Sequence, residues 1–358
     1  MKILVLEPYF GGSHKTFLEG LQAHVPFDFI LQTLPARKWK WRMRLAAPFF
    51  ADKITALCNS TEINAVFCSS FVDVATLRSL LPVPVSQLPF YTYFHENQFA
   101  YPVQKKDERD FHFGLTNLNT ILASDKVAFN SRYNLQTFLQ GVEQILQICP
   151  DMKLEGIVEK ITAKASTLYP GIDFSHVDRA AKLRRRNKQP PVIVWNHRWE
   201  HDKDPKYFFK ILFDLDADGL DFRLIILGQS FRRTPAVFAA AQEKLRKRII
   251  HCGFVESRKE YVRLLAQGDI VVSAARHEFY GISVIEAVRA GCIPLLPDRL
   301  AYPELFPPQY LYGNGDLFNR LQFLLDDPDM MDPAQTKALT DRFSWPDLRE
   351  KYIAWFEG

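Results

Sequence analysis

Short apolar runs alternate with segments of helical periodicity along most of the chain. Continuous apolar runs of this length are typical of parallel strands that are buried on both faces. The pattern therefore predicts an α/β protein in which strands and helices alternate. The predicted strands cover residues 2–7, 27–34, 65–69, 125–130, 192–195, 222–228, 249–254 and 270–274. The predicted helices include residues 52–58, 133–147, 234–247 and 259–266.

Two neighbouring regions depart from this alternation. Residues 83–88 lie among prolines at 82, 84 and 89, which predicts a short strand with restricted ends. The next stretch, YTYFHENQFAYPVQ at 91–104, places four consecutive polar groups between aromatic residues. Such an arrangement lines a sugar or base pocket better than it fills a core.

The stretch at 270–297, IVVSAARHEFYGISVIEAVRAGCIPLLP, predicts a strand, a loop, a helix and a second strand. Glu278 lies in the loop and Glu286 in the helix, so both carboxylates can reach the crevice at the strand's carboxyl end, where α/β sheets bind ligands. A helix that opens at Gly281 also offers N–H groups to a phosphate. Two carboxylates beside an anion site predict a sugar nucleotide. The alternative is that Glu286 solvates a helix and Glu278 decorates a loop.

A second backbone cradle follows the first strand, where Gly11 and Gly12 precede Ser13, His14 and a segment of helical spacing. A strand, a double glycine and a helix start can hold an anion. The stretch is not the dinucleotide fingerprint, because a clean Gly-x-Gly and the third glycine are missing. Taken alone, it is a tight turn.

The length and the composition of the chain limit the class of protein. A length of 358 residues with 47% hydrophobic residues predicts two domains, each with its own core. The first apolar run is broken at Glu7 and Pro8, too early for an export signal, and no apolar span is long enough for a membrane helix. We therefore expect the protein in the cytoplasm. Five scattered cysteines predict reduced thiols and neither a disulfide framework nor a zinc ribbon.

The stretch at 270–297 resembles the donor-site signature of retaining GT-B glycosyltransferases: two Glu residues separated by seven others, then Ala-Gly and a Pro-containing strand. Tyr280 supplies its aromatic residue just before Gly281, a mild departure from the usual Gly-aromatic-Gly. The resemblance implies a GT-B fold, in which two Rossmann-like domains face each other across a cleft. It also implies a nucleotide-sugar donor and no metal. In this family the first Glu contacts the donor sugar and the second the ribose, which assigns these roles to Glu278 and Glu286.

The same resemblance assigns further donor contacts. Arg198 and Lys203 would hold the donor diphosphate, where fixed cations stabilise the charge that gathers on the leaving group. The alternative for these two is a surface loop with ion pairs. His95 would face the sugar, and His95, Arg198, Lys203 and Glu278 form the predicted catalytic set. His197 and His201 suggest zinc only superficially, because no Glu directly follows the first His. The predicted backbone and helix-start contacts are Gly11, Gly12, Gly281, Ile282 and Ser283.

The resemblance also places the domain boundaries. The Pro-Gly turn in AKASTLYPGID marks the exit from a first domain at 1–173. Residues 174–189, which include the basic run KLRRRNK, then form a solvated linker, and the second domain covers 190–340. Residues 341–358 form a terminal helix that packs back on the first domain. Four of its residues lie at helical spacing and are expected in the core, namely Trp345, Leu348, Tyr352 and Trp355.

Three motifs, EPYFGGSH, HENQFAYP and FNSRYN, resemble one branch more narrowly, the tRNA-queuosine mannosyltransferases. These enzymes transfer mannose from GDP-mannose to the cyclopentene-diol of queuosine in an aspartate tRNA. The resemblance implies GDP-mannose as donor and a queuosine-containing tRNA as partner, and it leaves the base-reading residues and the oligomeric state open. Asp73 is a candidate at the acceptor side, although capping of the next helix explains it as well. The other acceptor-side candidates are His14, Lys38, Arg42, Glu96 and Asn97.

The segment ARKWKWRMR at 36–44 interleaves five cations with Trp39 and Trp41. Such a segment can follow a nucleic-acid backbone and stack on bases, or lie on an anionic membrane. A solvated basic helix whose tryptophans are core explains it equally well. A membrane role would favour a lipid or small-molecule acceptor. A non-catalytic nucleic-acid-binding protein of the same fold is the third alternative, and the four donor-site residues together argue against it.

Overall fold

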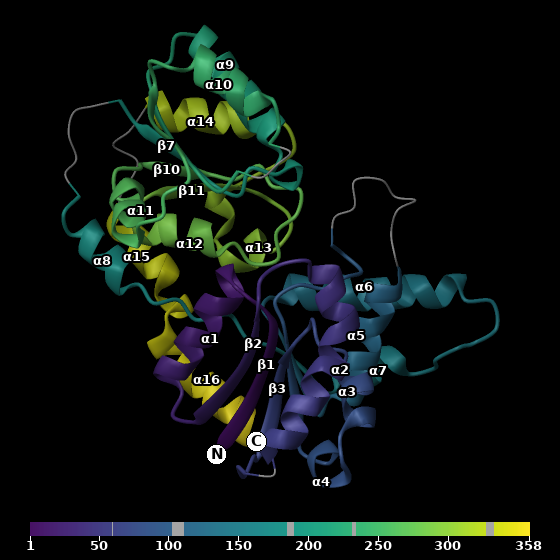
Figure 1. Ribbon diagram of the computed structural model, residues 1–358. Helices are drawn as coiled ribbons and strands as arrows, with labels where there is room; N and C mark the ends of the chain where they lie inside the picture. The colour runs from purple at the N-terminus through teal and green to yellow at the C-terminus, as the bar shows by residue number, and fades with distance from the viewer. Residues whose placement is uncertain (59, 102–110, 185–189, 231–233, 327–332) are drawn as a thin grey trace. The chain divides into compact units, whose positions relative to one another are not determined.

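The computed structural model describes residues 1–58, 60–101, 111–184, 190–230, 234–326 and 333–358. The chain forms two compact units, of which unit 1 holds Met1–Gly171 and Leu348–Gly358, and unit 2 holds Ile172–Asp347. Each unit is built on a six-stranded sheet in which the paired strands run parallel (Figure 1). The α/β class and the two parallel sheets predicted from the sequence are confirmed.

The sheet of unit 1 has the strand order β2-β1-β3-β4-β5-β6. Its strands are β1 (Lys2–Phe10), β2 (Asp28–Pro35), β3 (Ala65–Ser69), β4 (Phe90–Phe94), β5 (Lys126–Phe129) and β6 (Ala165–Thr167). The helices along this part of the chain are α1 (Gly12–His24), α2 (Trp39–Cys58), α3 (Val74–Leu80), α4 (Val83–Ser86), α5 (Phe111–Ala123), α6 (Arg132–Ile148) and α7 (Ile157–Thr162).

Alternate residues of the strands of unit 1 feed two cores, because successive side chains of a strand point to opposite faces of the sheet. Phe90 packs against α2 and α3, and Phe94 against α5 and α6. On the other face, Tyr93 stacks on Phe17 of α1. The helix α16 (Trp345–Glu357) covers this second face next to α1, where Phe356 contacts Phe67 and Tyr91 (Figure 1).

The residues of α16 show why the C-terminal segment belongs partly to unit 1. The hydroxyl of Tyr91 donates to the carbonyl of Phe356 at 3.3 Å, and the Lys126 ammonium donates to the carbonyl of Trp355 at 2.8 Å. The four residues expected in the core from their helical spacing, Trp345, Leu348, Tyr352 and Trp355, are all buried. This part of the prediction is confirmed.

The sheet of unit 2 has the strand order β12-β11-β10-β7-β8-β9. Its strands are β7 (Val192–Asn196), β8 (Arg223–Leu227), β9 (Ile249–Gly253), β10 (Ile270–Val272), β11 (Ile293–Pro297) and β12 (Leu311–Tyr312). Its α-helices are α8 (Ser175–Ala181), α9 (Pro205–Ala217), α10 (Val237–Lys244), α11 (Arg258–Leu265), α12 (Ile282–Arg289), α13 (Tyr302–Leu305), α14 (Leu317–Asp326) and α15 (Pro333–Thr340). Short 3₁₀ helices are η2 (His201–Lys203), η3 (Pro308–Tyr310) and η5 (Asp341–Phe343). Figure 1 shows α9, α10 and α14 on one side of the sheet and α11 and α12 on the other.

The prediction of a strand at residues 83–88 is wrong. These residues contain α4, and the strand is β4, which begins at Phe90. Proline fits the first turn of a helix, where its missing N–H has no partner to lose, so Pro84 is compatible with the second position of this short helix. The aromatic residues at 91–94, assigned to a pocket from the sequence, are instead buried strand residues, and only the residues from His95 onward follow the strand. Residues 102–104 of that stretch lie outside the described residues.

The prediction of a solvated linker at 174–189 also needs correction. Its first part is α8, and Asp178 of this helix accepts hydrogen bonds from the buried guanidinium of Arg289 in α12 at 2.5 and 2.9 Å. The same guanidinium pairs with Asp341 at 2.5 Å. Arg184 is also paired, with Asp269 at 2.6 Å. These ion pairs attach the segment to unit 2, and residues 185–189 lie outside the described part.

Among the described residues, no helix combines the length and the apolar character that a membrane crossing requires.

The Arg289 pairs generate the first prediction. We expect Arg289→Met to lower the free energy of unfolding by about 2 kcal/mol, because it removes the buried cation that Asp178 and Asp341 share and leaves Asp341 with Lys337 alone. The loss stays below the 3–5 kcal/mol typical of fully buried pairs because both carboxylates are partly exposed. Urea unfolding measures the change. The control is Arg263→Met, which removes an exposed partner of Glu260 and should cost about 1 kcal/mol or less. Equal losses in the two variants would contradict the structural role of Arg289.

Candidate active site

In unit 2, the loops that follow the adjacent strands β7 and β10 are joined through Lys203 and Glu278, the Lys203 pair. The Lys203 ammonium lies 3.3 Å from Glu278 Oε2 and 3.1 Å from Asp202 Oδ2, and it donates to the carbonyl of His277 at 2.6 Å. The carbonyl of Asp202 in turn accepts from the backbone N–H groups of Arg276 at 2.8 Å and His277 at 3.2 Å. The ammonium is buried; it donates to the carbonyl of His277 and to Glu278 Oε2, and the Asp202 carboxylate adds an ion pair.

The Lys203 pair fixes the charges in this part of unit 2. Burial alone would raise the pKa of Glu278, but the Lys203 ammonium outweighs it and holds that pKa at about 2. Burial, followed by repulsion from Lys203, lowers the pKa of His197 and of His277 to about 4. At neutral pH Glu278 is therefore ionised, and the imidazoles of His197 and His277 are neutral. The buried Nε2 of His197 has no hydrogen-bond partner among the described residues.

The start of α12 lies directly beside Glu278. Gly281 has φ 94°, and a Cβ there would lie 3.6 Å from Cγ of Glu278 and 3.4 Å from the ring of Tyr302. The hydroxyl of Ser283 donates to the carbonyl of Asn196 at 2.7 Å, which attaches the helix start to the end of β7. The first N–H groups of a helix have no partners within it, so the backbone of Gly281, Ile282 and Ser283 can cradle an anion.

Glu286 occupies the next turns of α12 and is buried. Its Oε1 accepts from Arg258 Nη2 at 2.5 Å, and its Oε2 accepts from the Tyr261 hydroxyl at 2.9 Å. The Tyr261 hydroxyl also accepts from Asn196 Nδ2 at 2.8 Å. Glu286 therefore does not merely solvate a helix face. Each carboxylate oxygen retains lone pairs for a further donor such as a ribose hydroxyl, so the ribose assignment stays a prediction.

The two cations predicted for the diphosphate differ in their environment. Arg198 is 49% exposed at its side chain and pairs with Glu200 at 3.1 Å, so its guanidinium can reach a ligand at the surface. The Lys203 ammonium is instead engaged with Asp202, His277 and Glu278. In this arrangement Lys203 orients Glu278, and a contact with a phosphate would require it to give up one of these acceptors.

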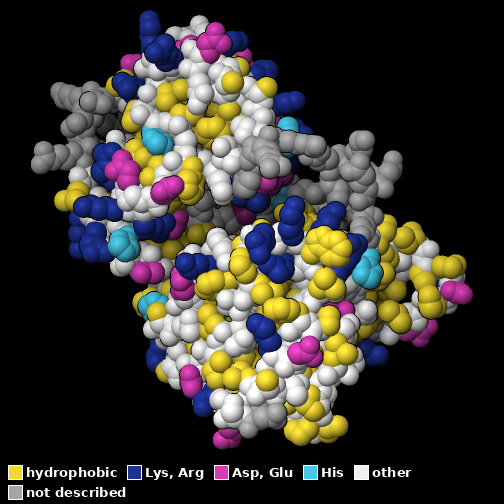
Figure 2. Space-filling model, viewed as in Figure 1, with side chains coloured by type: hydrophobic (Ala, Val, Ile, Leu, Met, Phe, Trp, Pro, Cys, Tyr) yellow, Lys and Arg dark blue, Asp and Glu magenta, His cyan; other side chains and the backbone are white. Residues whose placement is uncertain are grey.

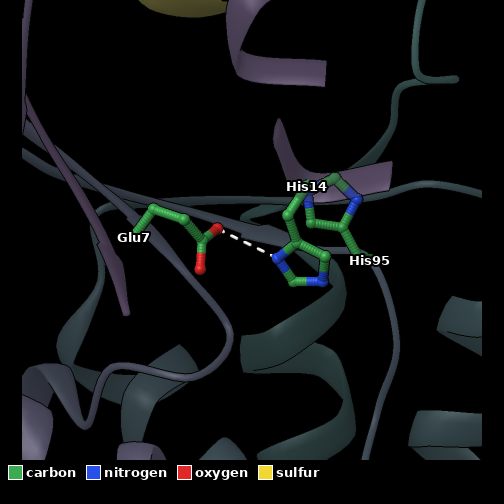
Figure 3. Close-up of side chains that lie close together, drawn as sticks. All are labelled: Glu7, His14 and His95. Carbon is green, nitrogen blue, oxygen red and sulfur yellow. Dashed lines mark hydrogen bonds and ion pairs between the residues drawn. The ribbon is translucent and has the colours of Figure 1, made fainter. Parts of the chain in front are cut away.

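In unit 1, a buried carboxylate and two histidines meet where β1 and β4 end; Glu7, His14 and His95 form the His14 cluster (Figure 3). Glu7 belongs to β1, His14 to the first turn of α1, and His95 directly follows β4. Glu7 Oε2 lies 2.9 Å from His14 Nδ1, and its Oε1 accepts from the N–H of Tyr9 at 2.7 Å and from the hydroxyl of Ser69 at 3.1 Å. The ring centroids of His14 and His95 lie 4.1 Å apart.

The two imidazoles of the His14 cluster titrate in opposite directions. Burial by itself lowers the pKa of His14, but the neighbouring Glu7 carboxylate outweighs it, so the pKa is raised above the ordinary 6.5. Burial, followed by repulsion from His14, lowers the pKa of His95 well below 6.5. The cluster therefore holds His95 neutral, and a neutral imidazole can both donate to and accept from sugar hydroxyls.

Within the described residues, the His14 cluster is also the one group whose carboxylate and imidazole atoms lie close enough for a metal, all within 4.8 Å of one another. The arrangement suits a cation poorly. The His14 and His95 rings are tilted by 32° at a centroid distance of 4.1 Å, and nitrogen lone pairs lie in the ring planes, so they do not point from one ring toward the other. His14 Nδ1 is also engaged with Glu7.

The other acceptor-side candidates have structural roles in unit 1. Asp73 caps α3, where it accepts from the N–H of Thr76 at 3.0 Å. This is the alternative that the sequence offered for Asp73. Asn97 is completely buried, and its amide donates to Asn134 at 2.9 Å and to Thr137 at 3.0 Å. Asn97 therefore supports the loop after β4 and is not placed to contact a ligand. Glu96 is partly exposed beside it.

The two glycines before α1 have different requirements. Gly12 has φ 53°, a conformation that favours glycine. Gly11 is extended, but a Cβ there would lie only 2.5 Å from Cβ of Ala36. Both residues therefore suit the close turn that starts α1, and their proposed contact with the donor stays a prediction.

Sequence reasoning did not identify several residues of these sites. Glu7 is a charged residue inside an apolar strand, which is the signal that could have indicated its role. His197 and Asp202 lie in the loop of Arg198 and Lys203, which the sequence predicts to bind the diphosphate. No spacing in the sequence links them to the loop of Glu278, more than 70 residues away. His197 was considered only as a zinc ligand, and the residues missed are Glu7, Ser69, Asp202, Arg258, Tyr261 and His277.

Comparisons with known proteins agree with this division of the chain. Residues 2–172 match the family described as tRNA-queuosine alpha-mannosyltransferase N-terminal, and residues 178–338 match glycosyl transferases group 1. The chain is 35% identical to a tRNA-queuosine alpha-mannosyltransferase of Drosophila melanogaster, over 98% of this chain and 95% of the relative. A shorter stretch, 36% of this chain and 33% of the relative, is 27% identical to a GDP-mannose:cellobiosyl-diphosphopolyprenol alpha-mannosyltransferase of Xanthomonas campestris.

Solved structures share the fold at low sequence identity. The Anabaena protein HepE, solved in complex with UDP, has a TM-score of 0.71 at 14% identity, with 99% of each chain covered. Sucrose-phosphate synthase of Thermosynechococcus elongatus has a TM-score of 0.69 at 14% identity, with 99% of this chain and 98% of the other covered. This likeness confirms the predicted GT-B fold.

The His14 cluster generates the second prediction. Glu7→Gln removes the carboxylate that raises the pKa of His14 while the ring stays buried, so His14 should titrate below 6.5 instead of above it. Because the raised pKa stabilises the fold when His14 is charged, the stability lost in Glu7→Gln should be largest below about pH 6.5. It should shrink as the pH rises through the folded-state pKa of His14.

Histidine NMR titration and urea unfolding at several pH values measure these two effects. Glu19→Gln, which changes an exposed carboxylate of the same helix, is the control and should leave the His14 titration unchanged. A His14 resonance that titrates identically in wild type and Glu7→Gln would disprove the coupling.

Proposed function

We propose, since the chain belongs to the tRNA-queuosine alpha-mannosyltransferase family, that it transfers one mannose from GDP-mannose to the cyclopentene-diol of queuosine in tRNA(Asp). The family makes the chain a glycosyltransferase with a tRNA substrate. The choice of donor is supported by the shorter likeness to an alpha-mannosyltransferase that is named for GDP-mannose. A tRNA substrate supports the cytoplasm as the place of the reaction.

The observation that carries the proposal is the buried Lys203 pair beside the start of α12. A carboxylate whose pKa is held at about 2 stays ionised at any physiological pH and accepts hydrogen bonds from sugar hydroxyls. The free N–H groups at the helix start and the exposed guanidinium of Arg198 suit a diphosphate. Glu286, with both oxygens already oriented by Arg258 and Tyr261, suits the ribose.

The proposed reaction retains the configuration at C1 of the sugar. The bond from C1 to the diphosphate oxygen breaks, and the acceptor oxygen bonds to C1 on the same face while its proton passes to the leaving diphosphate. Negative charge gathers on the diphosphate as the bond breaks, and preorganised positive groups in a site of low dielectric stabilise it. Arg198 and the α12 start would supply this stabilisation without a metal, while Lys203 orients Glu278.

Unit 1 carries the proposed sugar and acceptor contacts of the His14 cluster. His95, kept neutral, would face the sugar, and the neighbouring His14 ring, whose centroid lies 4.1 Å away, would fix the orientation of the His95 ring. The carboxyl ends of parallel strands are where α/β sheets bind ligands, and the cluster lies at the ends of β1 and β4.

The third prediction tests the reaction and its donor site together. Incubation with GDP-mannose and queuosine-containing tRNA, followed by digestion to nucleosides, should yield queuosine with one added hexose by mass spectrometry. Glu278→Ala should abolish the product, because it removes the carboxylate for the sugar. Arg198→Ala should lower turnover by about 10²-fold, the scale of losing one charge-stabilising donor.

The controls for the third prediction are Glu243→Ala and Arg246→Ala, which change exposed residues of unit 2 outside the proposed donor site. Both should turn over like wild type. Unchanged turnover in folded Arg198→Ala would overturn the assignment of Arg198. If the protein releases GDP or UDP from donors offered alone but forms no modified nucleoside, it is a glycosyltransferase whose acceptor is not this tRNA.

The fourth prediction concerns metals. Because positive charge from the protein is proposed to stabilise the leaving diphosphate, treatment with EDTA followed by gel filtration should leave the rate of mannose transfer unchanged. Adding Mg²⁺ or Mn²⁺ to the treated protein should not raise the rate. Loss of transfer with EDTA and its recovery with either ion would refute metal independence.

A further inference from the structure

Positive charge and exposed aromatic area coincide at the start of α2 in unit 1. Residues 36–51 contain five cations and no acidic residue. Four of the cations, Arg37, Lys38, Lys40 and Arg44, have exposed side chains. Figure 2 shows Lys and Arg side chains gathered at the end of unit 1 where α2 starts in Figure 1. We call Arg37, Lys38, Lys40, Trp41 and Arg44 the basic-aromatic surface.

The two tryptophans of this segment do different things. Trp39 is half-buried and packs against Phe71, with ring centroids 6.3 Å apart, and against Phe113 at 5.2 Å. Trp41 is 62% exposed among the cations. An exposed aromatic side chain between cations is the combination with which proteins bind single-stranded nucleic acid, by stacking on bases and neutralising phosphates.

The backbone at the start of α2 adds to the positive charge. Lys38 has φ 53°, a conformation that a side-chain-bearing residue rarely adopts and that clusters at functional positions. Its carbonyl accepts from the N–H of Trp41 at 2.9 Å, which begins the helix, so the positive end of the helix dipole lies here. Arg42 differs from its neighbours, because its guanidinium donates to the carbonyl of Pro35 at 3.2 Å and holds the turn before the helix.

Aromatic contacts connect the basic-aromatic surface to the His14 cluster. The ring of Trp39 contacts Phe71, Phe71 contacts His14 at 5.4 Å, and His14 contacts His95 at 4.1 Å. All these residues follow or end strands of one parallel sheet, so they lie at its carboxyl edge. A nucleic acid that presents one nucleotide to His95 therefore has its neighbouring phosphates within reach of these cations.

We propose that the basic-aromatic surface binds the single-stranded loop of the tRNA that carries the reacting nucleotide. Arg37, Lys38, Lys40 and Arg44 contact its phosphates, and Trp41 stacks on an unpaired base. The inference rests on the proposed function. RNA is favoured over an anionic membrane because the surface is continuous, through Trp39 and Phe71, with a buried polar cluster that a lipid surface does not enter.

The test measures tRNA binding by the full chain as a function of salt concentration. Each lost phosphate contact reduces the slope of log K against log salt by about 0.7 to 0.9. Arg37→Ala/Lys40→Ala should therefore reduce the magnitude of the slope by about 1.4 to 1.8 and weaken binding about tenfold at 0.15 M salt. Trp41→Ala should weaken binding at least about fivefold and leave the slope unchanged, because it removes stacking and no charge.

The matched control is Arg246→Ala/Lys247→Ala, which removes the same charge from exposed residues of unit 2. It should change the slope little. Thermal unfolding verifies that each variant folds, and Arg37→Gln/Lys40→Gln replaces the alanine variant if that one does not. Equal effects in the two double variants would show that tRNA is attracted by overall charge and not by the basic-aromatic surface, which would overturn the proposal. Unchanged tRNA binding in Arg37→Ala/Lys40→Ala would also overturn it.

Two further measurements separate this inference from the proposed function. If wild type adds hexose to queuosine in tRNA while Arg37→Ala/Lys40→Ala binds tRNA normally, the basic-aromatic surface is not the RNA-binding site, but the proposed function is supported. If wild type adds no hexose, the function fails whatever the binding shows. A third outcome is that wild type co-sediments with vesicles containing anionic lipid, that Trp41→Ala does not, and that neither binds tRNA. This outcome would overturn the RNA proposal and identify a membrane as the partner of the surface.

Discussion

The buried ammonium of Lys203 is the constraint on which the loops after β7 and β10 depend. Removing an ammonium from water costs several kcal/mol, and the fold is compatible with it only if acceptors surround the charge. Asp202, Glu278 and the carbonyl of His277 supply them from the loops after β7 and β10. Because these loops follow adjacent strands of one sheet, a single charge fixes their mutual position. It also fixes the protonation of the groups around it, with Glu278 ionised and His197 and His277 neutral.

In unit 1 the buried charge is negative, and hydrogen-bond donors surround it. Glu7 is a buried carboxylate, and the imidazole of His14, the hydroxyl of Ser69 and the N–H of Tyr9 satisfy it. Burial, and after it repulsion from His14, lowers the pKa of His95 in the neighbouring ring. In both units burial, with a neighbouring cationic or protonatable group as the second cause, lowers the pKa of an imidazole. Neutral imidazoles and ionised carboxylates bind hydroxyl groups without presenting an uncompensated charge, which suits a sugar ligand.

The sheets could be predicted from the sequence because short, continuous apolar runs fit strands that are buried on both faces and fit little else. Prediction failed where a local pattern has two physical meanings. The aromatic run at 91–94 was assigned to a pocket, whereas the residues of β4 are buried in the core. The basic run before residue 190 indicated a linker, because nothing in its spacing shows that Asp178 of α8 meets Arg289 in α12. Glu278 and Glu286 were selected from their spacing, and their roles stay predictions. The residues that pair with them come from distant segments, which no local pattern indicates.

The tryptophans of α2 show how geometry can decide an ambiguity that composition leaves open. Successive helical residues are about 100° apart, so residues two positions apart point about 200° from each other. Trp39 and Trp41 therefore could not both be core, and the structure buries the first more deeply while exposing the second. The exposed one lies in unit 1, whose residues match the tRNA-modifying family specifically, whereas unit 2 matches glycosyl transferases in general. Acceptor choice is then expected to reside in unit 1, because the family that unit 2 matches is described for glycosyl transferases in general.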